Sequence, residues 1–322
     1  MSRGVVRADR VGTDRRAHPD SESPPRASLT VALATPNIRR YRDIDDFRAH
    51  MSELARSAAQ VGAKVLLLPE LVCVGLLWSS ERAASTTVRD VQRLYEDVLT
   101  PLYPAFTQTL SGIAQEAGLT IVGATFWHKE AGRSVNSGFV FRPNGTRLRQ
   151  DKLHPTRPER AIGTLGGDRL FVFDIDGVRC GMAICYDVQF PEVTRQLVDA
   201  GLEVLFVPSL TDERGVSRVK YCAHARAIEN QMLVCVSPLV GDLGIPVERP
   251  VHGAGAAFVA APIDNNFTSV DGLHAAESGC DGELLIAELD IGIVRATRAK
   301  SEIRQLADRR PDLYPTLKPE LV

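Results

Sequence analysis

Short apolar runs alternate with amphipathic stretches along most of the chain. Leu29–Ala34 is an apolar run that predicts a strand, and apolar residues three and four apart over Phe47–Val61 then predict a helix that faces a core. Val65–Leu68 predicts a buried strand closed by Pro69, because proline cannot continue a central ladder. Phe106–Ala117 has the same helical spacing. Alternating strands and helices of this kind indicate an α/β fold.

Two hairpins are predicted farther along the chain. A turn at Pro143–Gly145 follows the apolar strand Phe139–Phe141, and Asp176-Gly177 lies between the strand patterns Leu170–Phe173 and Val178–Ile184. Proline, asparagine, aspartate and glycine favour the backbone angles of tight turns, so each pair of strands is expected to be antiparallel.

Two segments of the chain resemble each other. Gly62–Leu71 and Gly201–Leu210 each contain a glycine at a helix exit, a buried strand, a proline and then a polar residue. Convergence of ordinary helix-to-strand units and a true structural repeat both explain this likeness. Under either explanation, Glu70 and Ser209 are expected at equivalent strand ends, where sites gather in α/β sheets.

Composition and charge narrow the class of partner. The chain has 322 residues, of which 44% are apolar and 24% charged, so it can bury a large core in one domain or two. Its formal net charge of -2 gives no electrostatic basis for binding nucleic acid or an anionic membrane. Since no window approaches the roughly 18 apolar residues of a membrane span, we expect a small-molecule partner, no nucleic acid and no membrane.

The first residues differ in composition from the rest of the chain. Residues 1–27 are rich in Arg, Asp, Ser and Pro and lack the apolar stretch of a secretory signal. Their acidic residues also argue against an organelle transit segment. We therefore expect a flexible N-terminal arm and a cytoplasmic protein.

The six cysteines do not indicate a disulfide framework or a metal site. They form neither Cys-x-x-Cys pairs nor the dense spacing of small disulfide-rich domains. The histidines are scattered, and Cys222 and His224 diverge if they lie on a helix, so no zinc site is predicted. We expect no metal and no cofactor.

One cysteine stands at a position that suits a nucleophile. Cys185 follows the apolar strand pattern Val178–Ile184, and Pro191 then fits the first turn of a helix. A thiol at the carboxyl end of a strand can be exposed at a sheet edge and can use backbone N–H groups as oxyanion donors. A cysteine taken alone is more often a small buried apolar residue, so its partners decide between these interpretations.

Two further groups at strand ends supply what a thiol needs to cleave an amide. Glu70 follows the strand Val65–Leu68, and Lys152 follows the second strand of the first hairpin. With a free pKa near ~8.5, only a few per cent of a thiol is ionised at neutral pH, so a carboxylate base is needed. The Lys152 ammonium and the Tyr186 backbone N–H can stabilise the oxyanion, and one such donor typically lowers the barrier by about 3 kcal/mol.

The segments around these residues resemble a known family. Leu68–Glu70, Asp151–His154 and Ala183–Glu192 are similar to the three signature motifs of the nitrilase superfamily of carbon-nitrogen hydrolases. Each motif alone is weak, whereas three in order over about 115 residues are specific. The resemblance implies that the glutamate is the general base, that the lysine stabilises the oxyanion and that the cysteine is the nucleophile.

The resemblance also implies a fold and its extent. It covers about residues 28–315 and implies a four-layer α-β-β-α sandwich, in which two sheets face each other with helices outside. The hydrolase domain is placed at 28–300, and a C-terminal tail at 301–322 is expected to pack on a partner subunit. Family members commonly pair through a helical face, so we expect a homodimer or a higher homo-oligomer.

Other residues match the family pattern around this set. Glu159 matches the family's second glutamate, which helps to position the substrate and the catalytic lysine, whereas a solvated carboxylate beside Arg157 and Arg160 is the alternative. Asn136 and the turn after it resemble the family's usual approach to the lysine. Arg226–Gln231 resembles a family helix, in which an ion pair and a cap are favoured over a catalytic role.

The residues after the nucleophile bear on the substrate. Cys185-Tyr186-Asp187 resembles amidases, whereas nitrilases usually have Cys-Trp-Glu, so an amide or carbamoyl substrate is favoured over a nitrile. Ser209 and His154 are candidate substrate-binding residues, although exposed basic residues more often only aid solubility. Specificity is expected to reside in the loops Trp78–Thr87, Trp127–Ser134 and Asp212–Arg218.

The sequence therefore favours a cofactor-free thiol hydrolase that cleaves a non-peptide carbon-nitrogen bond of a small molecule through a thioester. A catalytically silent binding or assembly module of the same fold is the second hypothesis, and the intact Glu-Lys-Cys set argues against it. An acyl transferase or a nitrile hydrolase would use the same groups. The membrane-bound transferases of this superfamily are disfavoured, since the chain lacks a long apolar span.

Overall fold

The computed structural model describes residues 6–7, 28–247, 251–276 and 283–316. Within these ranges the α-helices are α1 (Ile44–Gln60), α2 (Val91–Ala117), α3 (Arg157–Ala161), α4 (Pro191–Asp199), α5 (Glu213–Asn230) and α6 (Ile291–Lys300). Short 3-10 helices are η1 (Val74–Ser79), η2 (Glu81–Ser85), η3 (Cys185–Gln189) and η4 (Tyr314–Thr316). The strands are β1 (Val6–Arg7), β2 (Ser28–Ala34), β3 (Val65–Leu68), β4 (Thr120–Glu130), β5 (Arg133–Phe141), β6 (Arg147–Asp151), β7 (Val172–Ile175), β8 (Val178–Met182), β9 (Val204–Ser209), β10 (Leu233–Pro238), β11 (Gly241–Asp242), β12 (His252–Gly253), β13 (Phe258–Ala260), β14 (Leu273–Ala276) and β15 (Leu284–Asp290).

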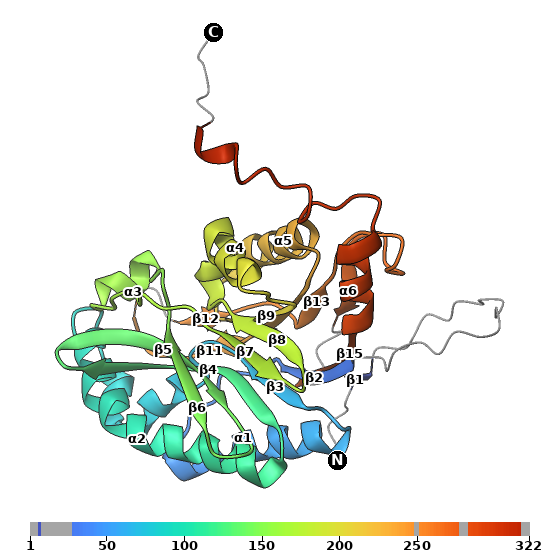
Figure 1. Cartoon of the computed structure of the whole chain (residues 1–322). Helices are drawn as coiled ribbons and strands as arrows, with labels where there is room; N and C mark the ends of the chain where they lie inside the picture. Colours follow the sequence, from blue (N-terminus) through green and yellow to red (C-terminus); the bar gives the residue numbers. More distant parts are fainter. Residues whose placement is uncertain (1–5, 8–27, 248–250, 277–282, 317–322) are drawn as a thin grey trace.

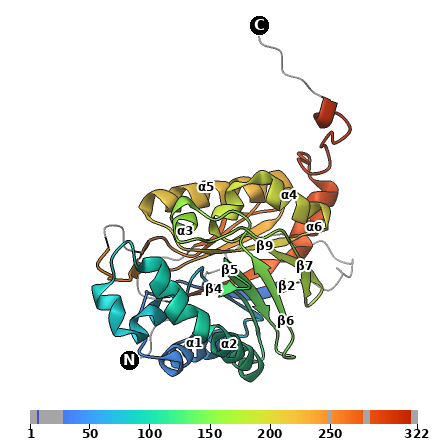
Figure 2. The same ribbon diagram turned by 90° about the vertical axis from the view of Figure 1, so that its left-hand side faces the viewer.

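Two β-sheets lie face to face between two layers of helices (Figures 1 and 2). The first sheet has the strand order β1-β15-β2-β3-β4-β5-β6, and α1 and α2 cover its outer face. The second sheet has the order β14-β13-β10-β9-β8-β7, and α4 and α5 cover it. A separate ribbon pairs β11 with β12. The predicted four-layer α-β-β-α sandwich is therefore confirmed.

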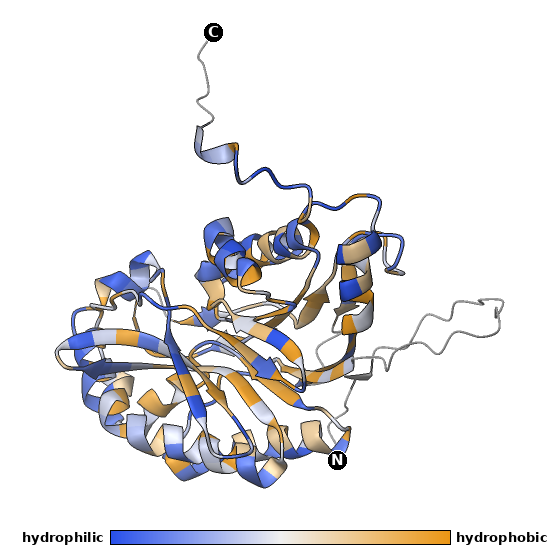
Figure 3. Ribbon diagram, viewed as in Figure 1, coloured by the Kyte–Doolittle hydropathy of each residue, from blue (hydrophilic) through white to orange (hydrophobic). Residues whose placement is uncertain are grey.

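Three apolar layers join the four structural layers. The first packs α1 and α2 against the first sheet, and it contains a run of ring contacts from Phe47 through Phe106 to Phe126. The second fills the space between the sheets, where Val65 and Phe206 are fully buried. The third joins the second sheet to α4 and α5. Figure 3 shows many apolar positions along the central strands, a mixture of apolar and polar positions along the helices, and mostly polar positions along the tail. Burial of this apolar surface, at about 25 cal/mol per Å², is the main force that holds the layers together.

The helices α1 and α2 differ in how closely they follow the predicted patterns. α1 begins after Asp43, whose side chain accepts a hydrogen bond from Asp46 N (2.8 Å), and it buries the predicted apolar stripe. α2 begins at Val91, well before the predicted stripe, and contains Pro101 and Pro104. Prolines disfavour a helix interior, but buried side chains on both sides of them pack into the first apolar layer and outweigh that preference.

Both predicted hairpins form. β5 and β6 are antiparallel and are joined through the predicted turn at Pro143–Gly145, and β7 and β8 turn at Asp176-Gly177, where both residues have positive φ. The strand that was predicted to reach Ile184 ends at Met182, because the chain leaves the sheet there to begin η3.

The three segments expected to be specificity loops consist largely of regular structure. Trp127–Ser134 forms the end of β4 and the start of β5, and Trp127 is buried with its Nε1 donating to Thr164 Oγ1 (2.8 Å). Asp212–Arg218 is the N-cap and the first turns of α5. These two loop predictions are wrong because their polar residues occupy an exposed hairpin tip and a capped helix start. Trp78–Thr87 contains the end of η1 and all of η2.

The ends of the chain are described only in part. Within the predicted arm, Val6–Arg7 forms β1, which pairs in parallel with β15, and the rest of residues 1–27 lies outside the described residues. The tail after α6 reaches α4, where Arg309 forms an ion pair with Asp199 (2.7 Å), and its last described turn projects away from the body (Figure 1). Packing of the tail on a partner subunit stays a prediction. No helix in the described ranges has the length and apolar character needed to cross a membrane.

Gly123 lies where β4 contacts both β3 and β9, and its φ is 88°. A Cβ there would lie 2.2 Å from Leu68 O and 3.1 Å from Pro208 Cβ, whereas at Gly62, with a φ of 80°, a Cβ would meet no atom within 4 Å. We expect Gly62→Ala to lower the free energy of unfolding by about 1 to 3 kcal/mol, the cost of a non-glycine residue at positive φ, and Gly123→Ala to lower it further. Urea denaturation compares the two variants. Equal losses would contradict the close packing of β4 at this point.

Candidate active site

Glu70 lies at the carboxyl end of β3, as predicted, and is almost fully buried. Its Oε1 accepts hydrogen bonds from Lys152 Nζ (2.7 Å) and Asn136 Nδ2 (2.9 Å), and its Oε2 accepts one from Leu210 N (3.1 Å). A buried carboxylate is tolerated only where such donors replace water. These contacts hold the carboxylate between the end of β6 and the end of β9.

Lys152 follows β6 directly and is only 1% exposed. Its backbone N donates to Asn136 O and its backbone O accepts from Gly167 N, each at 2.8 Å, so the main chain is fixed on both sides of the residue. Its Nζ donates to Glu70 Oε1 and to Glu159 Oε2, each at 2.7 Å. An ammonium has three N–H donors. Among the described residues two of them serve the glutamates, and the third can serve a bound oxyanion.

Cys185 begins η3, three residues after β8 ends, and its φ of 49° lies in the left-handed region. Residues other than glycine are strained in this region and persist there only where the surrounding structure holds them. The thiol lies 3.6 Å from Leu210 O, and Ser209 Oγ lies 3.5 Å from Sγ. Because Leu210 N also holds Glu70, one residue contacts both the thiol and the carboxylate.

The likeness between Gly62–Leu71 and Gly201–Leu210 predicted that Glu70 and Ser209 would lie at equivalent strand ends. Glu70 and Ser209 do emerge at equivalent ends of β3 and β9, one from each sheet. Ser209 contacts the Cys185 thiol, and Leu210, the next residue, contacts both the thiol and Glu70. This placement does not separate convergence from a structural repeat. Contact of Ser209 with a substrate stays a prediction.

Glu159 lies in the first turn of α3 and faces Lys152. Thr156 N and Oγ1 donate to its Oε2 (2.8 and 2.7 Å), and its own N–H donates to Thr156 Oγ1 (3.5 Å), which forms a capping box. Asn136 Nδ2 donates to Oε1 (3.0 Å). The side chain is only 12% exposed, so the alternative of a solvated carboxylate is not what the structure shows. Its role in positioning stays a prediction.

Asn136 and Leu210 complete the site and were not among the predicted site residues. The Asn136 side-chain nitrogen donates to both Glu70 and Glu159, which requires that the NH₂ end of the amide face the two carboxylates. The sequence indicates only that Asn136 belongs to the segment that leads to Lys152. Leu210 acts through its backbone N–H and C=O, and its apolar side chain carries no signal of that role.

The two glutamates have opposite pKa shifts. Burial raises the pKa of Glu70 above its ordinary value, and the attraction of Lys152 only partly opposes this rise. Burial acts in the same direction on Glu159, but Lys152 and the donors from Thr156 lower the pKa of Glu159 below its ordinary value. Burial by itself lowers the pKa of Lys152, yet the two carboxylates outweigh it and raise that pKa, so the lysine stays an ammonium. Glu70 is therefore the carboxylate suited to exchange a proton.

Cys185 does not ionise by itself at neutral pH. Burial, and after it the negative charge of Glu70, raises the pKa of the Cys185 thiol to about 12, although Lys152 opposes the shift. Leu210 joins the two groups, because its O accepts from the thiol and its N donates to Glu70. The arrangement is thus a protonated thiol beside a carboxylate base, with an ammonium within reach of both.

Tyr186 and His154 lie around this centre. Tyr186 is the second residue of η3, and the first N–H groups of a helix lack intrahelical partners, so an oxyanion donor there is compatible with the structure and stays a prediction. His154 Nδ1 lies 2.9 Å from Asp187 Oδ1, and its ring stacks on Phe190 at 3.8 Å. One ring nitrogen and one ring face therefore support the loop, while substrate contact by His154 stays a prediction.

The predicted ion pair and cap in α5 support the turn of the nucleophile. Arg226 Nε and Nη2 donate to Val188 O (3.0 Å) and Gln189 O (3.2 Å), and Nη1 pairs with Glu229 (2.7 Å). Asn230 Nδ2 donates to Arg226 O (3.0 Å). These residues hold the backbone of η3 and do not contact Glu70, Lys152 or Cys185 through any described hydrogen bond.

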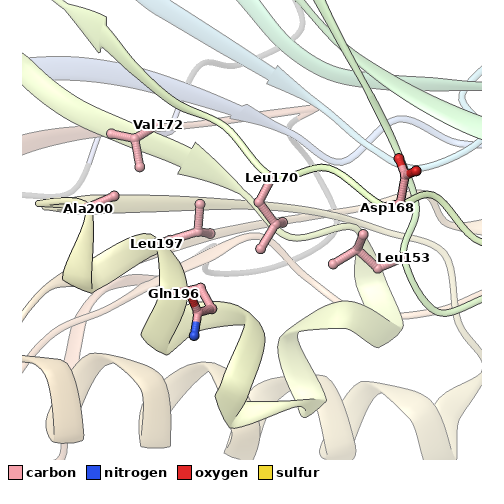
Figure 4. A pocket seen from close by; sticks show the side chains of 7 residues that line it. All are labelled: Leu153, Asp168, Leu170, Val172, Gln196, Leu197 and Ala200. Carbon is pink, nitrogen blue, oxygen red and sulfur yellow. The ribbon is translucent and has the colours of Figure 1, made fainter.

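A surface depression of about 400 Å³ lies beside the segment that follows Lys152, and neither Glu70 nor Cys185 lines it. Figure 4 shows its lining, in which apolar side chains from the approach to β7 and from α4 face one another. The lining residues are Leu153, Asp168, Leu170, Val172, Gln196, Leu197 and Ala200.

The described cysteines and metal-ligating side chains give no further site. Five cysteines are free thiols, and Cys280 lies outside the described residues. Within the described ranges no group of three or more His, Cys, Asp or Glu side chains is placed to hold a metal ion.

Known proteins match the chain over most of its length. The family model described as carbon-nitrogen hydrolase matches residues 30–299. The probable hydrolase YhcX of Bacillus subtilis (strain 168) is 31% identical over 289 residues, which are 89% of this chain and 54% of that protein. The omega-amidase NIT2-A of Xenopus laevis is 26% identical over 272 residues, which are 81% of this chain and 88% of that protein. The chain thus spans about half the length of YhcX.

Solved structures share the fold. A carbon-nitrogen hydrolase from Helicobacter pylori G27 matches with a TM-score of 0.70 at 20% identity. The match covers 89% of this chain and 97% of the Helicobacter pylori chain. A mutant of the Nesterenkonia AN1 amidase from the nitrilase superfamily has a TM-score of 0.63 at 22% identity and covers 90% and 98%. At these identities the likeness concerns the fold alone.

The pKa shifts predict how the reactivity of Cys185 depends on pH. Because the thiol is protonated at neutral pH, its alkylation by iodoacetamide needs ionised Glu70, and the rate should fall as pH drops through the raised pKa of Glu70. We call this fall the acid step, and in Glu70→Gln we expect no such step and a loss of about 10²-fold at any pH above the raised pKa of Glu70. Peptide mass spectrometry of alkylated Cys185 measures the alkylation rate at each pH, with Cys222→Ala as the control. An unchanged profile in Glu70→Gln would contradict this role.

Removal of the shared ammonium should destabilise the fold in a pH-dependent way. Lys152→Met leaves two buried carboxylates, and we expect a loss of about 3 to 5 kcal/mol at neutral pH. Without the lysine their folded-state pKa values exceed the unfolded ones, so the folded state gains protons and the loss shrinks as pH falls. Lys129→Met, which breaks an exposed pair with Glu96, should cost less than about 1 kcal/mol. Urea unfolding at neutral and acidic pH measures the loss in each variant. A loss in Lys152→Met that does not vary with pH would contradict the pairing of Lys152 with Glu70 and Glu159.

Proposed function

The chain belongs to the carbon-nitrogen hydrolase family, and we propose that it hydrolyses an amide or carbamoyl carbon-nitrogen bond of a small molecule, other than a peptide bond, through a thioester on Cys185. The observation that carries this proposal is a buried site in which the Lys152 ammonium binds Glu70 and Leu210 joins Glu70 to the Cys185 thiol. The raised pKa of Glu70 suits a group that takes up and returns a proton.

In the acylation step the thiol proton passes to Glu70 as the sulfur attacks the carbonyl carbon. The carbonyl oxygen becomes an oxyanion, which the third N–H of Lys152 and the Tyr186 backbone N–H stabilise. Removal of one such donor typically costs about 10² to 10³ in rate. Protonated Glu70 then gives its proton to the nitrogen, the carbon-nitrogen bond breaks, and ammonia or an amine leaves.

In the deacylation step water takes the place of the amine. Glu70, again ionised, accepts a proton from that water as its oxygen attacks the thioester carbon. The same donors stabilise the second oxyanion. The carbon-sulfur bond then breaks, the sulfur regains the proton from Glu70, and the acid leaves. Glu159 remains an anion throughout and keeps Lys152 in place.

Two similarities support an amide substrate. Relatives of the chain include an omega-amidase, and its fold is shared by an amidase. The residues Cys185-Tyr186-Asp187 also have the amidase form of the motif. Of the three segments expected to set specificity, Trp78–Thr87 follows Glu70 most closely and is the first place to test it.

The proposed steps use only water and groups of this chain, in accord with the expected absence of a cofactor. That expectation, the homodimer or higher homo-oligomer and the cytoplasmic location stay predictions.

A panel of simple amides, omega-amides and N-carbamoyl compounds, scored by ammonia release, tests the proposal. We expect turnover of at least one compound, and a loss of at least about 10³-fold in Cys185→Ala, because the nucleophile is gone. Intact-protein mass spectrometry should find the acyl adduct in the wild type and in Cys222→Ala, but not in Cys185→Ala.

The alternatives give different results in the same assays. Full ammonia release by Cys185→Ala would contradict the nucleophile. Faster transfer of the acyl group to an added amine than to water would identify an acyl transferase, and turnover of nitriles alone a nitrile hydrolase. A silent binding module would form no adduct, and its Cys185 would react with iodoacetamide no faster than the other thiols.

A further inference from the structure

One buried side chain joins the turn of Cys185 to the segment of Lys152. Asp187, two residues after the cysteine, is fully buried. Its Oδ2 accepts a hydrogen bond from Leu153 N (3.1 Å), and its Oδ1 accepts one from His154 N (2.8 Å) and lies 2.9 Å from His154 Nδ1. A single carboxylate therefore holds the two backbone N–H groups that follow the lysine.

Other contacts fix the lysine segment relative to the first sheet. Lys152 N bonds to Asn136 O in β5, and Lys152 O bonds to Gly167 N in the loop after α3. Gly167 packs so closely that a Cβ there would lie 2.7 Å from Asp151 O. None of these contacts involves the turn of Cys185. The Asp187 carboxylate supplies that link.

The turn itself is held from its other side. Arg226 in α5 binds Val188 O and Gln189 O, and Asp187 N donates to Ile184 O (3.0 Å). Since the backbone around Asp187 is fixed, a change in its hydrogen bonds should act on Leu153 and His154, whose N–H groups it holds, and through them on the position of the Lys152 side chain.

We propose that Asp187 is a positioning residue that sets the distance between the Lys152 ammonium and the Cys185 thiol. It holds the peptide after the lysine, so that the ammonium remains beside Glu70 and beside the place where the oxyanion forms. A misplacement of about 1 Å can cost 10²-fold in rate, so such a contact matters although it touches no substrate. The inference rests on the proposed function for the reaction, and on the observed hydrogen bonds for the geometry.

The substitution Asp187→Asn isolates the contact. Asparagine has nearly the same shape but one acceptor oxygen and an NH₂ group. If the oxygen keeps the two contacts with His154, the NH₂ group faces Leu153 N, donor against donor, next to Lys152. The ammonium then recedes from Glu70, and the pKa of Glu70 rises because the opposing attraction weakens.

The test measures the alkylation of Cys185 by iodoacetamide against pH, together with kcat and KM for the best amide of the panel. We expect Asp187→Asn to move the acid step of alkylation to higher pH and to lower kcat by about 10- to 100-fold, with KM changed by less than about threefold. If Asp187 acted on stability alone, the substitution would not move the acid step, and it would not lower kcat while KM stayed nearly unchanged. The inference is overturned if the acid step is unmoved or kcat is unchanged.

Three variants complete the test. Asp174→Asn removes a carboxylate that accepts Gly177 N at an exposed turn, and it should match the wild type in all readouts. His154→Phe keeps both backbone bonds and an aromatic ring on Phe190, so it should leave the acid step close to that of the wild type and show that the backbone bonds carry the effect. If Asp187→Asn does not fold, Asp187→Ser, which loses one acceptor oxygen, decides, and an unmoved step there overturns the inference. If the wild type hydrolyses no amide, the proposed function fails, yet the acid step still tests Asp187.

Discussion

The ammonium of Lys152, shared by two buried carboxylates, is the interaction on which the site depends. It brings Glu70 and Glu159 together, and each glutamate in turn keeps the lysine charged. The surroundings then divide their roles. Glu159 accepts additional hydrogen bonds from Thr156, which help to lower its pKa, whereas burial outweighs the lysine at Glu70, raises its pKa and suits it to accept a proton in the proposed mechanism.

The fold makes this arrangement by bringing together the ends of strands from both sheets. β3 and β6 of the first sheet lead into Glu70 and Lys152, and β8 and β9 of the second lead into Cys185 and Leu210. The apolar layer between the sheets therefore sets the distances within the site, because packed cores resist deformation. The residues that adjust the site act largely through backbone groups.

The sequence predicted the architecture better than the details that complete the site. Apolar strands closed by proline placed Glu70 and Ser209 correctly, and the three family motifs identified Lys152 and Cys185 as their neighbours. The spacing of Thr156 and Glu159 is that of a capping box, a sequence signal that fixes the glutamate at a helix start. It does not show that a lysine lies opposite.

Other features follow from tertiary packing and leave no local pattern. The backbone contacts of Leu210 are independent of its side chain, so no residue type announces them. α2 continues through Pro101 and Pro104 because its buried face outweighs their helix preference, and Trp127 is part of a long hairpin instead of a loop. In each case the neighbours in space decide, and they are distant in sequence.

In the proposed mechanism a neutral thiol and a carboxylate base, and not a preformed thiolate paired with Lys152, make the nucleophile. The ultraviolet absorbance of thiolate, recorded as the difference between the wild type and Cys185→Ala across pH, tests it most directly. We expect no thiolate of Cys185 at neutral pH and its appearance only at strongly alkaline pH, since burial raises the pKa of this thiol to about 12. A full thiolate signal at neutral pH would contradict the account.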